Sequence, residues 1–160
     1  MISLDFLENI DVFKSLNDHQ LKTIQECGET VDFKRDDRIF GQGDDAAFVW
    51  IVLEGDVELR TESSGNAQTN EPSVSFMSAA HAFGWTCFVP PYKYRLSGYC
   101  TSRWCKVIKF KREELLTLFK NDEIIGFQVM NYLIGTVGKQ FEQYQDEIAR
   151  KRGIEIMSQW

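Results

Sequence analysis

The unbroken apolar run from Phe48 to Leu53 is the feature that most constrains the fold of this chain. A run of this length, followed by the turn Glu54-Gly55-Asp56, is typical of a β-strand that is covered on both faces. Val57 and Leu59 then alternate with polar residues, as in the second strand of a hairpin. We therefore expect a central strand here, inside a layered β-structure, with a hairpin at Gly55.

Short strand-like segments occupy residues 31 to about 110, at a spacing of about 8–12 residues. They are 31–33, 39–40, 48–53, 57–59, 74–77, 96–100 and 104–110. Residues 61–73 are rich in Ser, Asn, Gly, Gln and Thr, which is typical of an exposed loop. Many short strands separated by turns predict a β-sandwich or a barrel-like roll.

Helical periodicity flanks the strands on both sides. In the first 30 residues, apolar side chains recur at steps of three and four, and Asn17 or Asp18 is a suitable N-cap for a second helix that ends at Gly28. After the strands, an amphipathic helix is expected at 111–120 and a longer one from Asp122 to about residue 152.

The fold class that follows is mainly β with flanking helices. We predict a double-stranded β-helix, that is a jelly-roll-like β-roll, at 31–110 as the sensor core. An N-terminal helical segment at 1–30 precedes it, and C-terminal helices at 111–160 serve coupling and dimerisation.

An apolar stripe with coiled-coil spacing runs along the last predicted helix. Its steps alternate between three and four residues over three heptads, the a/d pattern of a helix–helix seam. The stripe consists of Phe127, Met130, Ile134, Val137, Phe141, Tyr144 and Ile148. We expect a homodimer through this stripe; the alternative is that the stripe packs on the chain's own roll. Gly126, Gly135 and Gly138 weaken the helix by about 1 kcal/mol each relative to Ala, and they either allow close helix packing or mark a flexible point.

The charge balance argues against two classes of partner. Lys and Arg number 18 against 24 Asp and Glu, a formal net charge of -6, so the chain as a whole repels phosphate backbones and no nucleic-acid partner is expected. No run of 18 apolar residues occurs, so no membrane partner is expected. The first nine residues carry no basic side chain, unlike a secretory signal, and a cytoplasmic location is expected.

The cysteines and histidines do not form a recognisable metal site. Cys27, Cys87, Cys100 and Cys105 include no CxxC pair, and the chain has only 2 His, so no metal is expected. We expect reduced, mostly buried thiols. Because no nucleophile elbow, P-loop or HExxH motif occurs, the chain is not expected to be an enzyme.

Three motifs, in order, carry a resemblance to a known family. They are Ile39-Phe40-Gly41-Gln42-Gly43-Asp44, then the segment from Trp50 to Leu59 with its Gly55 turn, then Phe83-Gly84 with ten residues between Gly84 and Arg95. With helices before and after the strands, the chain resembles the cyclic nucleotide-binding domain, as found in the catabolite activator proteins, over about residues 6–150.

The resemblance implies a ligand site between Phe83 and Ser97. In the family, backbone N–H groups of a short helix after Phe-Gly, here Trp85 and Thr86, face the cyclic phosphate, as suits an anion. A Glu beside the Gly holds the ribose 2′-hydroxyl, but this chain has Trp85 there, which offers one donor and no carboxylate. We expect Trp85 to fill the core rather than to stack on a ligand.

Two registers remain open for the arginine that neutralises the phosphate in the family. Without a gap, Arg95 takes that position; with a one-residue shift, Tyr94 takes it and Arg95 points outward. Ser97 ends the site, and Gln140 of the last helix lies where the family caps the purine. No cofactor is assigned, and the ligand class implied is a cyclic nucleotide or another small anion.

The function expected from these observations is a regulatory, ligand-sensing module. Because Trp85 replaces the ribose-binding Glu, the module is expected to be degenerate for cAMP and cGMP. The alternative is a ligand-free dimeric interaction or scaffold module. Only eight residues follow Arg152, so the DNA-reading helices of the family's transcription factors are not expected, and the sequence does not identify a downstream partner.

Overall fold

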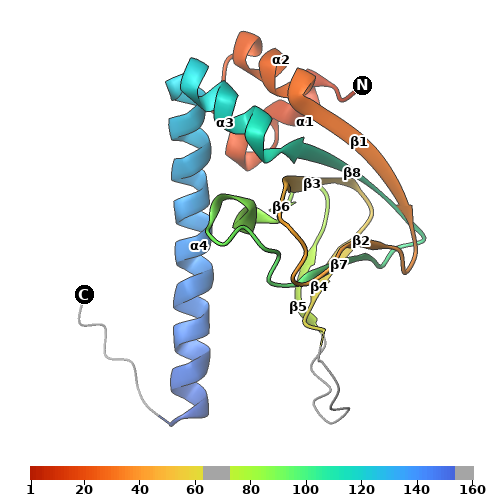
Figure 1. The fold of residues 1–160 in the computed structure, drawn as a ribbon, viewed down its shortest axis with the longest axis vertical. Coiled ribbons are helices and arrows are strands. Elements are labelled where there is room, and N and C mark those ends of the chain that lie inside the picture. The colour runs from red at the N-terminus through yellow and green to blue at the C-terminus, as the bar shows by residue number, and fades with distance from the viewer. Residues whose placement is uncertain (63–72, 154–160) are drawn as a thin grey trace.

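Two four-stranded antiparallel sheets form a β-roll, as Figure 1 shows for a computed structural model that describes residues 1–62 and 73–153. The strand orders are β1-β8-β3-β6 and β2-β7-β4-β5. The strands are β1 (Gly28–Lys34), β2 (Arg38–Phe40), β3 (Phe48–Glu54), β4 (Val57–Arg60), β5 (Ser73–Met77), β6 (Ala82–Phe83), β7 (Ser97–Cys100) and β8 (Trp104–Lys111). The predicted fold class is confirmed.

Helices lie at both ends of the chain and gather at one end of the roll, except for the last and longest helix, which runs along the side of the roll (Figure 1). They are α1 (Leu4–Glu8), the 3₁₀ turn η1 (Asp11–Phe13), α2 (Asp18–Cys27), α3 (Arg112–Asn121) and α4 (Glu123–Lys151), with a second 3₁₀ turn, η2 (Trp85–Phe88), between β6 and β7. Asn17 caps α2 as predicted: its Oδ1 accepts from Gln20 N at 2.9 Å, while Gln20 Oε1 accepts from Asn17 N at 3.0 Å. This reciprocal pair is a capping box.

Gly28 ends α2 as predicted, but for a reason that is not local. Its φ of -92° and ψ of 136° are extended, not left-handed, and it is already the first residue of β1. A Cβ at Gly28 would lie 2.3 Å from Ile108 Cδ1 of the neighbouring β8. The glycine therefore leaves room for the buried side chain of Ile108.

The run from Phe48 to Leu53 forms β3, which lies between β8 and β6. Its four central residues are at most 6% exposed, so side chains on both faces of the strand are buried. This confirms the prediction of a doubly covered strand. Gly55 follows in the left-handed region at φ 84°, where a side chain would also clash with the carbonyl of Trp104, 2.5 Å from an ideal Cβ.

The expectation of four reduced thiols is wrong for two of them. Cys100 at the end of β7 and Cys105 in β8 form a disulfide, which joins the two sheets at the corner between these strands. The spacing of the two cysteines does not reveal this pair. The residues meet because the chain turns from one sheet to the other between β7 and β8. Cys87 is buried and free, and Cys27 is half-buried and free.

Most of the buried residues of helix α4 lie in its first part, and Ala149 near its C-terminal end is buried as well. Asp122 caps it by accepting from the backbone N–H groups of Ile124 and Ile125. Ile125, Val129 and Leu133 are buried, and the first turns contact α3 and η1. A Cβ at Gly126 would lie 2.8 Å from Phe119 Cβ, so this glycine allows the close approach of α3 and α4.

The predicted stripe lies on a different face of α4 and is largely exposed within the protomer. Met130 is half-buried, whereas the other six side chains are between 47% and 73% exposed. The second half of α4 runs down beside the roll (Figure 1). The described part of the chain therefore does not bury the stripe.

Candidate functional site

The turn from β6 into η2 is built around Gly84. Gly84 has φ 82° and is the N-cap of η2. A Cβ at this position would lie 2.9 Å from Trp50 Cδ1 and 3.3 Å from the carbonyl oxygen of Phe48. Glycine is thus required both by its conformation and by the close approach of β3. Phe83 before it is buried, with its ring stacked on Trp50 at 6.4 Å.

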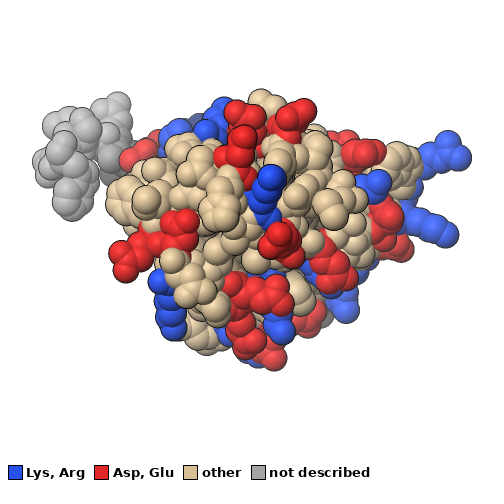
Figure 2. Space-filling model, turned by 90° about the horizontal axis from the view of Figure 1, so that it is seen from above, with Lys and Arg blue, Asp and Glu red and all other residues tan. Residues whose placement is uncertain are grey.

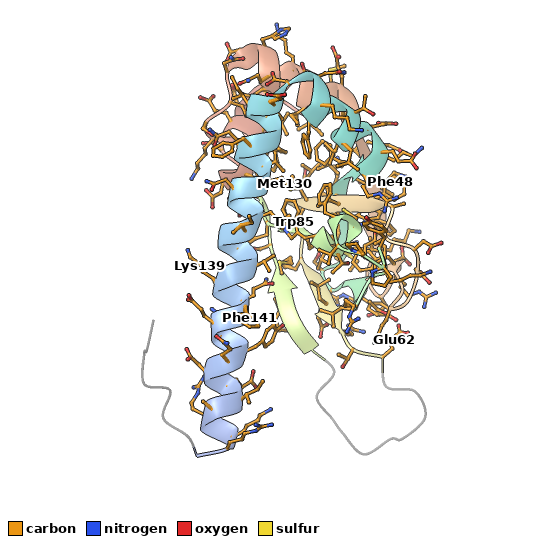
Figure 3. All side chains as sticks on the ribbon, turned by 60° about the vertical axis from the view of Figure 1, so that its left-hand side comes forward. Phe48, Glu62, Trp85, Met130, Lys139 and Phe141 are labelled. Atoms are coloured by element: carbon orange, nitrogen blue, oxygen red, sulfur yellow. A yellow bond between two sulfur atoms is a disulfide. The ribbon has the colours of Figure 1, made fainter. Side chains whose placement is uncertain are left out.

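Trp85 points away from the interior of the roll and toward the helices (Figure 3). Its ring lies 6.3 Å from that of Phe88 and 6.4 Å from that of Tyr132 of α4. It lines a small apolar cavity with Val12, Phe13, Val49, Ile51, Phe110, Leu115, Phe119 and Val129. The cavity offers about 10 Å³ to the centre of a water molecule, which is room for about one water. Trp85 is thus half-buried and packs against the core, and its indole Nε1 is buried without a hydrogen-bond partner in the described residues.

Tyr94, not Arg95, enters the interior of the roll. The Tyr94 side chain is 4% exposed, and its ring stacks on Phe40 with 3.9 Å between centroids. Its hydroxyl donates to the carbonyl of Phe48 at 2.7 Å and accepts from Trp50 Nε1 at 3.0 Å. Burial raises the pKa of Tyr94 above its ordinary value, so the phenol stays protonated and able to donate.

Arg95 is exposed, and within residues 1–62 and 73–153 it forms no ion pair. The structure therefore places Arg95 on the outside of the roll. No Asp, Glu, Lys, Arg or His of the described residues is buried. The interior next to Gly84 consequently presents neither a cation for a phosphate nor a carboxylate for a ribose.

Ser97 and Tyr99 share one face of β7, the outer face, because Gly98 between them packs against the ring of Phe40 in the interior. Ser97 is fully buried, and its hydroxyl accepts from Gln42 N at 2.8 Å. Next to it, Tyr99 donates to the carboxylate of Glu62, and hydrogen bonds from Tyr99 and Ser97 lower the pKa of that carboxyl. Figure 3 shows Glu62 on the side of the roll away from α4.

The charged groups of this outer face are paired with one another. Arg60 binds Glu58 at 2.8 Å and lies 4.5 Å above the ring of Tyr99. Arg38 lies 3.9 Å from Glu62. At the helical end of the molecule, acidic and basic side chains are interspersed (Figure 2), so the face seen there offers no continuous basic surface.

The predicted site residues are thus only partly brought together. Phe83, Gly84 and Tyr94 meet at the roll interior, Trp85 faces the helices, and Thr86 is half-buried in η2. Arg95 and Gln140 are exposed. Sequence reasoning missed the aromatic residues that complete the interior, which are Phe40, Phe48 and Trp50. The alternation of Phe48 and Trp50 along one strand was the available signal.

Contacts on the other side of η2 connect it to α3 and α4. The ring of Phe88 lies 6.3 Å from that of Phe119 in α3, and Trp85 contacts Tyr132 in α4. Arg112, the first residue of α3, donates to the carbonyl of Cys87 at 3.4 Å and covers the ring of Tyr92 at 4.5 Å. A displacement of η2 would therefore be transmitted to both helices.

The described residues carry neither a metal cluster nor a membrane-spanning helix. No group of three or more His, Cys, Asp and Glu side chains there is placed to hold a metal ion. Within the same residues, no helix has the length and apolar character needed to span a membrane.

Comparisons with known proteins agree with this architecture. The family model "Cyclic nucleotide-binding domain" matches residues 30–122, and no curated protein matches. A candidate cyclic nucleotide-binding protein from Geobacter metallireducens GS-15 is 28% identical, with a TM-score of 0.74 over 88% of this chain and 99% of that chain. A cyclic nucleotide-binding domain from Methylobacillus flagellatus KT is 17% identical (TM-score 0.74, 96% of this chain and 84% of that one). The Thermus thermophilus catabolite activator protein is 16% identical (TM-score 0.71, 87% and 63%).

Proposed function

The chain belongs to the cyclic nucleotide-binding domain family, and from this premise we propose that it is a regulatory module degenerate for cAMP and cGMP. Its working parts are the turn η2 and the helices α3 and α4 that η2 contacts. In this function, regulation acts by changing the position of α3 and α4 relative to the roll.

The observation that carries the proposal is the chemistry around Gly84. Trp85 stands where the resemblance expects the ribose-binding Glu, and its side chain packs toward α4. Tyr94, a neutral group, occupies the interior, while Arg95 is exposed. Loss of one hydrogen bond to a charged group costs about 1.5–3 kcal/mol, which is about 10- to 150-fold in affinity. Loss of both charged anchors weakens binding further.

Isothermal titration calorimetry with cAMP and with cGMP tests this degeneracy. We expect neither nucleotide to give saturable binding in the micromolar range. Micromolar binding of either one to the wild-type chain would contradict the proposal.

We further propose that the module acts as a homodimer through α4. From Ile134 onward the helix has 18 residues, and one chain leaves most of their apolar side chains exposed. Most of the stability of a helix in a protein comes from packing of its apolar face, and Gly135 and Gly138, at which a Cβ would meet nothing within 4 Å, weaken this helix further. A second copy fits the stripe because the a/d spacing makes it self-complementary.

The ligand-free scaffold module is the second candidate. The stacking of Tyr94 on Phe40 favours it, since a side chain already fills the interior. The two candidates share the dimer and differ in whether any small molecule moves η2.

A further inference from the structure

The side chain of Tyr94 packs against the turn at Gly84 from the interior of the roll. An ideal Cβ at Gly84 would lie 3.4 Å from Tyr94 Cε1, so the phenol ring is in van der Waals reach of this turn. On its other side the ring stacks on Phe40 at 3.9 Å, with 17° between the planes. Inside the roll, the ring therefore packs between this turn and Phe40.

The hydroxyl of Tyr94 fixes the ring in this position. It donates to Phe48 O at 2.7 Å, and it accepts from Trp50 Nε1 at 3.0 Å and from Phe48 N at 3.3 Å. The backbone of Tyr94 is also held, by hydrogen bonds with Asp44 O at 3.0 Å and Gly43 N at 2.8 Å. The residue thus ties the loop after η2 to β3 through its side chain and to the loop after β2 through its backbone.

The opposite side of η2 contacts the helices. Trp85 and Phe88 face Tyr132 and Phe119, and Arg112 donates to the carbonyl of Cys87. The 3₁₀ turn is therefore held between Tyr94 and Trp50 on the roll side and α3 and α4 on the other.

We propose that Tyr94 is a built-in substitute for a bound ligand, a positioning residue whose phenol holds η2, and through η2 the helices α3 and α4, in one arrangement. This inference rests on the proposed function, because it explains what takes the place of the nucleotide. It implies that the module keeps its helix arrangement without any added molecule.

Replacement of Tyr94 by a smaller residue tests the inference by chemical rescue. In Tyr94→Ala, 4-methylphenol supplies the missing ring and hydroxyl, and toluene supplies the ring alone. Two measurements report how firmly η2 and the helices are held. They are the alkylation rate of the buried thiol of Cys87 in η2, and amide hydrogen exchange in residues 112–133. Exchange in β1 and β8 serves as the internal reference for global unfolding.

We expect Tyr94→Ala to raise Cys87 alkylation and exchange in 112–133 by about tenfold or more, the equivalent of losing one to two hydrogen bonds. Addition of 4-methylphenol should restore wild-type rates, toluene should restore them less, and neither should change the wild-type chain. Unchanged rates in Tyr94→Ala, or no rescue by 4-methylphenol, would overturn the inference.

A conservative variant keeps the test decisive if Tyr94→Ala does not fold. Tyr94→Phe keeps the ring but leaves Trp50 Nε1 without its acceptor, so Cys87 alkylation should rise, whereas the matched control Tyr99→Phe on the outer face should leave it unchanged. Equal rates in the two variants would overturn the inference. Nucleotide binding by the wild-type chain would instead refute the proposed function, so the two failures are distinguishable.

Discussion

Ile134→Lys is the sharpest perturbation of the proposed dimer. Ile134 is 73% exposed in the protomer, the largest exposure in the stripe. Full burial of an Ile side chain is worth about 1.5–3 kcal/mol, so burial of the exposed three quarters contributes about 1–2 kcal/mol per copy and about 2–4 kcal/mol per symmetric dimer. The substitution should therefore raise the dimer dissociation constant by about 30- to 1000-fold.

Sedimentation equilibrium over a range of protein concentrations measures this change. Gln143→Lys is the matched control, because it places the same charge on the same helix at an exposed position outside the stripe. Since Ile134 is exposed in the protomer, its replacement should change the free energy of unfolding of the protomer by no more than about 0.5 kcal/mol. A dimer retained unchanged by Ile134→Lys would place the interface elsewhere, and a wild-type chain that is monomeric throughout would refute the dimer itself.

Three further predictions concern the folded chain. Gly84→Ala should lower the free energy of unfolding in urea by about 1–3 kcal/mol, because Gly84 has φ 82° and its Cβ would lie 2.9 Å from Trp50 Cδ1; full stability would contradict the described turn. The double variant Cys100→Ser/Cys105→Ser should unfold about 2 kcal/mol more easily, and wild-type protein in a reducing agent should match it; a difference near zero would argue against the pairing. Burial raises the pKa of Cys87 from about 9 to about 12, so its contribution to stability is complete below pH 9 and is lost at about 1.4 kcal/mol per pH unit as the pH rises toward 12. Cys87→Ala should lack this part of the alkaline slope in urea unfolding, and an identical slope would refute the assignment.

Local patterns in the sequence predict the scaffold well. The run that forms β3, the cap at Asn17, the cap at Asp122 and the stripe of α4 are each encoded by neighbours within one or two turns or one strand. Such signals need no knowledge of distant partners, which explains why the order of helices and strands was predictable.

Neighbouring residues in the sequence do not determine which way the side chains of the site point. In an extended segment neighbouring side chains point to opposite sides, so a shift of one residue decides whether Tyr94 or Arg95 points inward. Contacts with a segment distant in sequence set this register: Asp45 forms a β-bridge with Lys93, and Gly43 N donates to the carbonyl of Tyr94. A shift by one residue exchanges the two faces of an extended chain. The sequence therefore defined the two alternatives, and only contacts with β2 and β3 decide between them.

The disulfide and the aromatic interior were missed for a related reason. Cys100 and Cys105 are close in sequence, but they lie in strands of different sheets and meet only because the chain turns a corner between β7 and β8. Phe40 meets Tyr94 only when β2 and the loop before β7 are brought together. Neither contact follows from periodicity or from spacing.

Our central proposal is that the turn at Gly84 does not bind a cyclic nucleotide. The side chain of Tyr94 packs beside the turn, and no charged side chain of the described residues is buried there. The most direct measurement is the ¹H–¹⁵N correlation spectrum of the wild-type chain during titration with cAMP, observed at the backbone amides of Gly84, Trp85, Thr86 and Cys87. We predict that these four resonances keep their positions throughout the titration. Saturable shifts at these amides would contradict the claim.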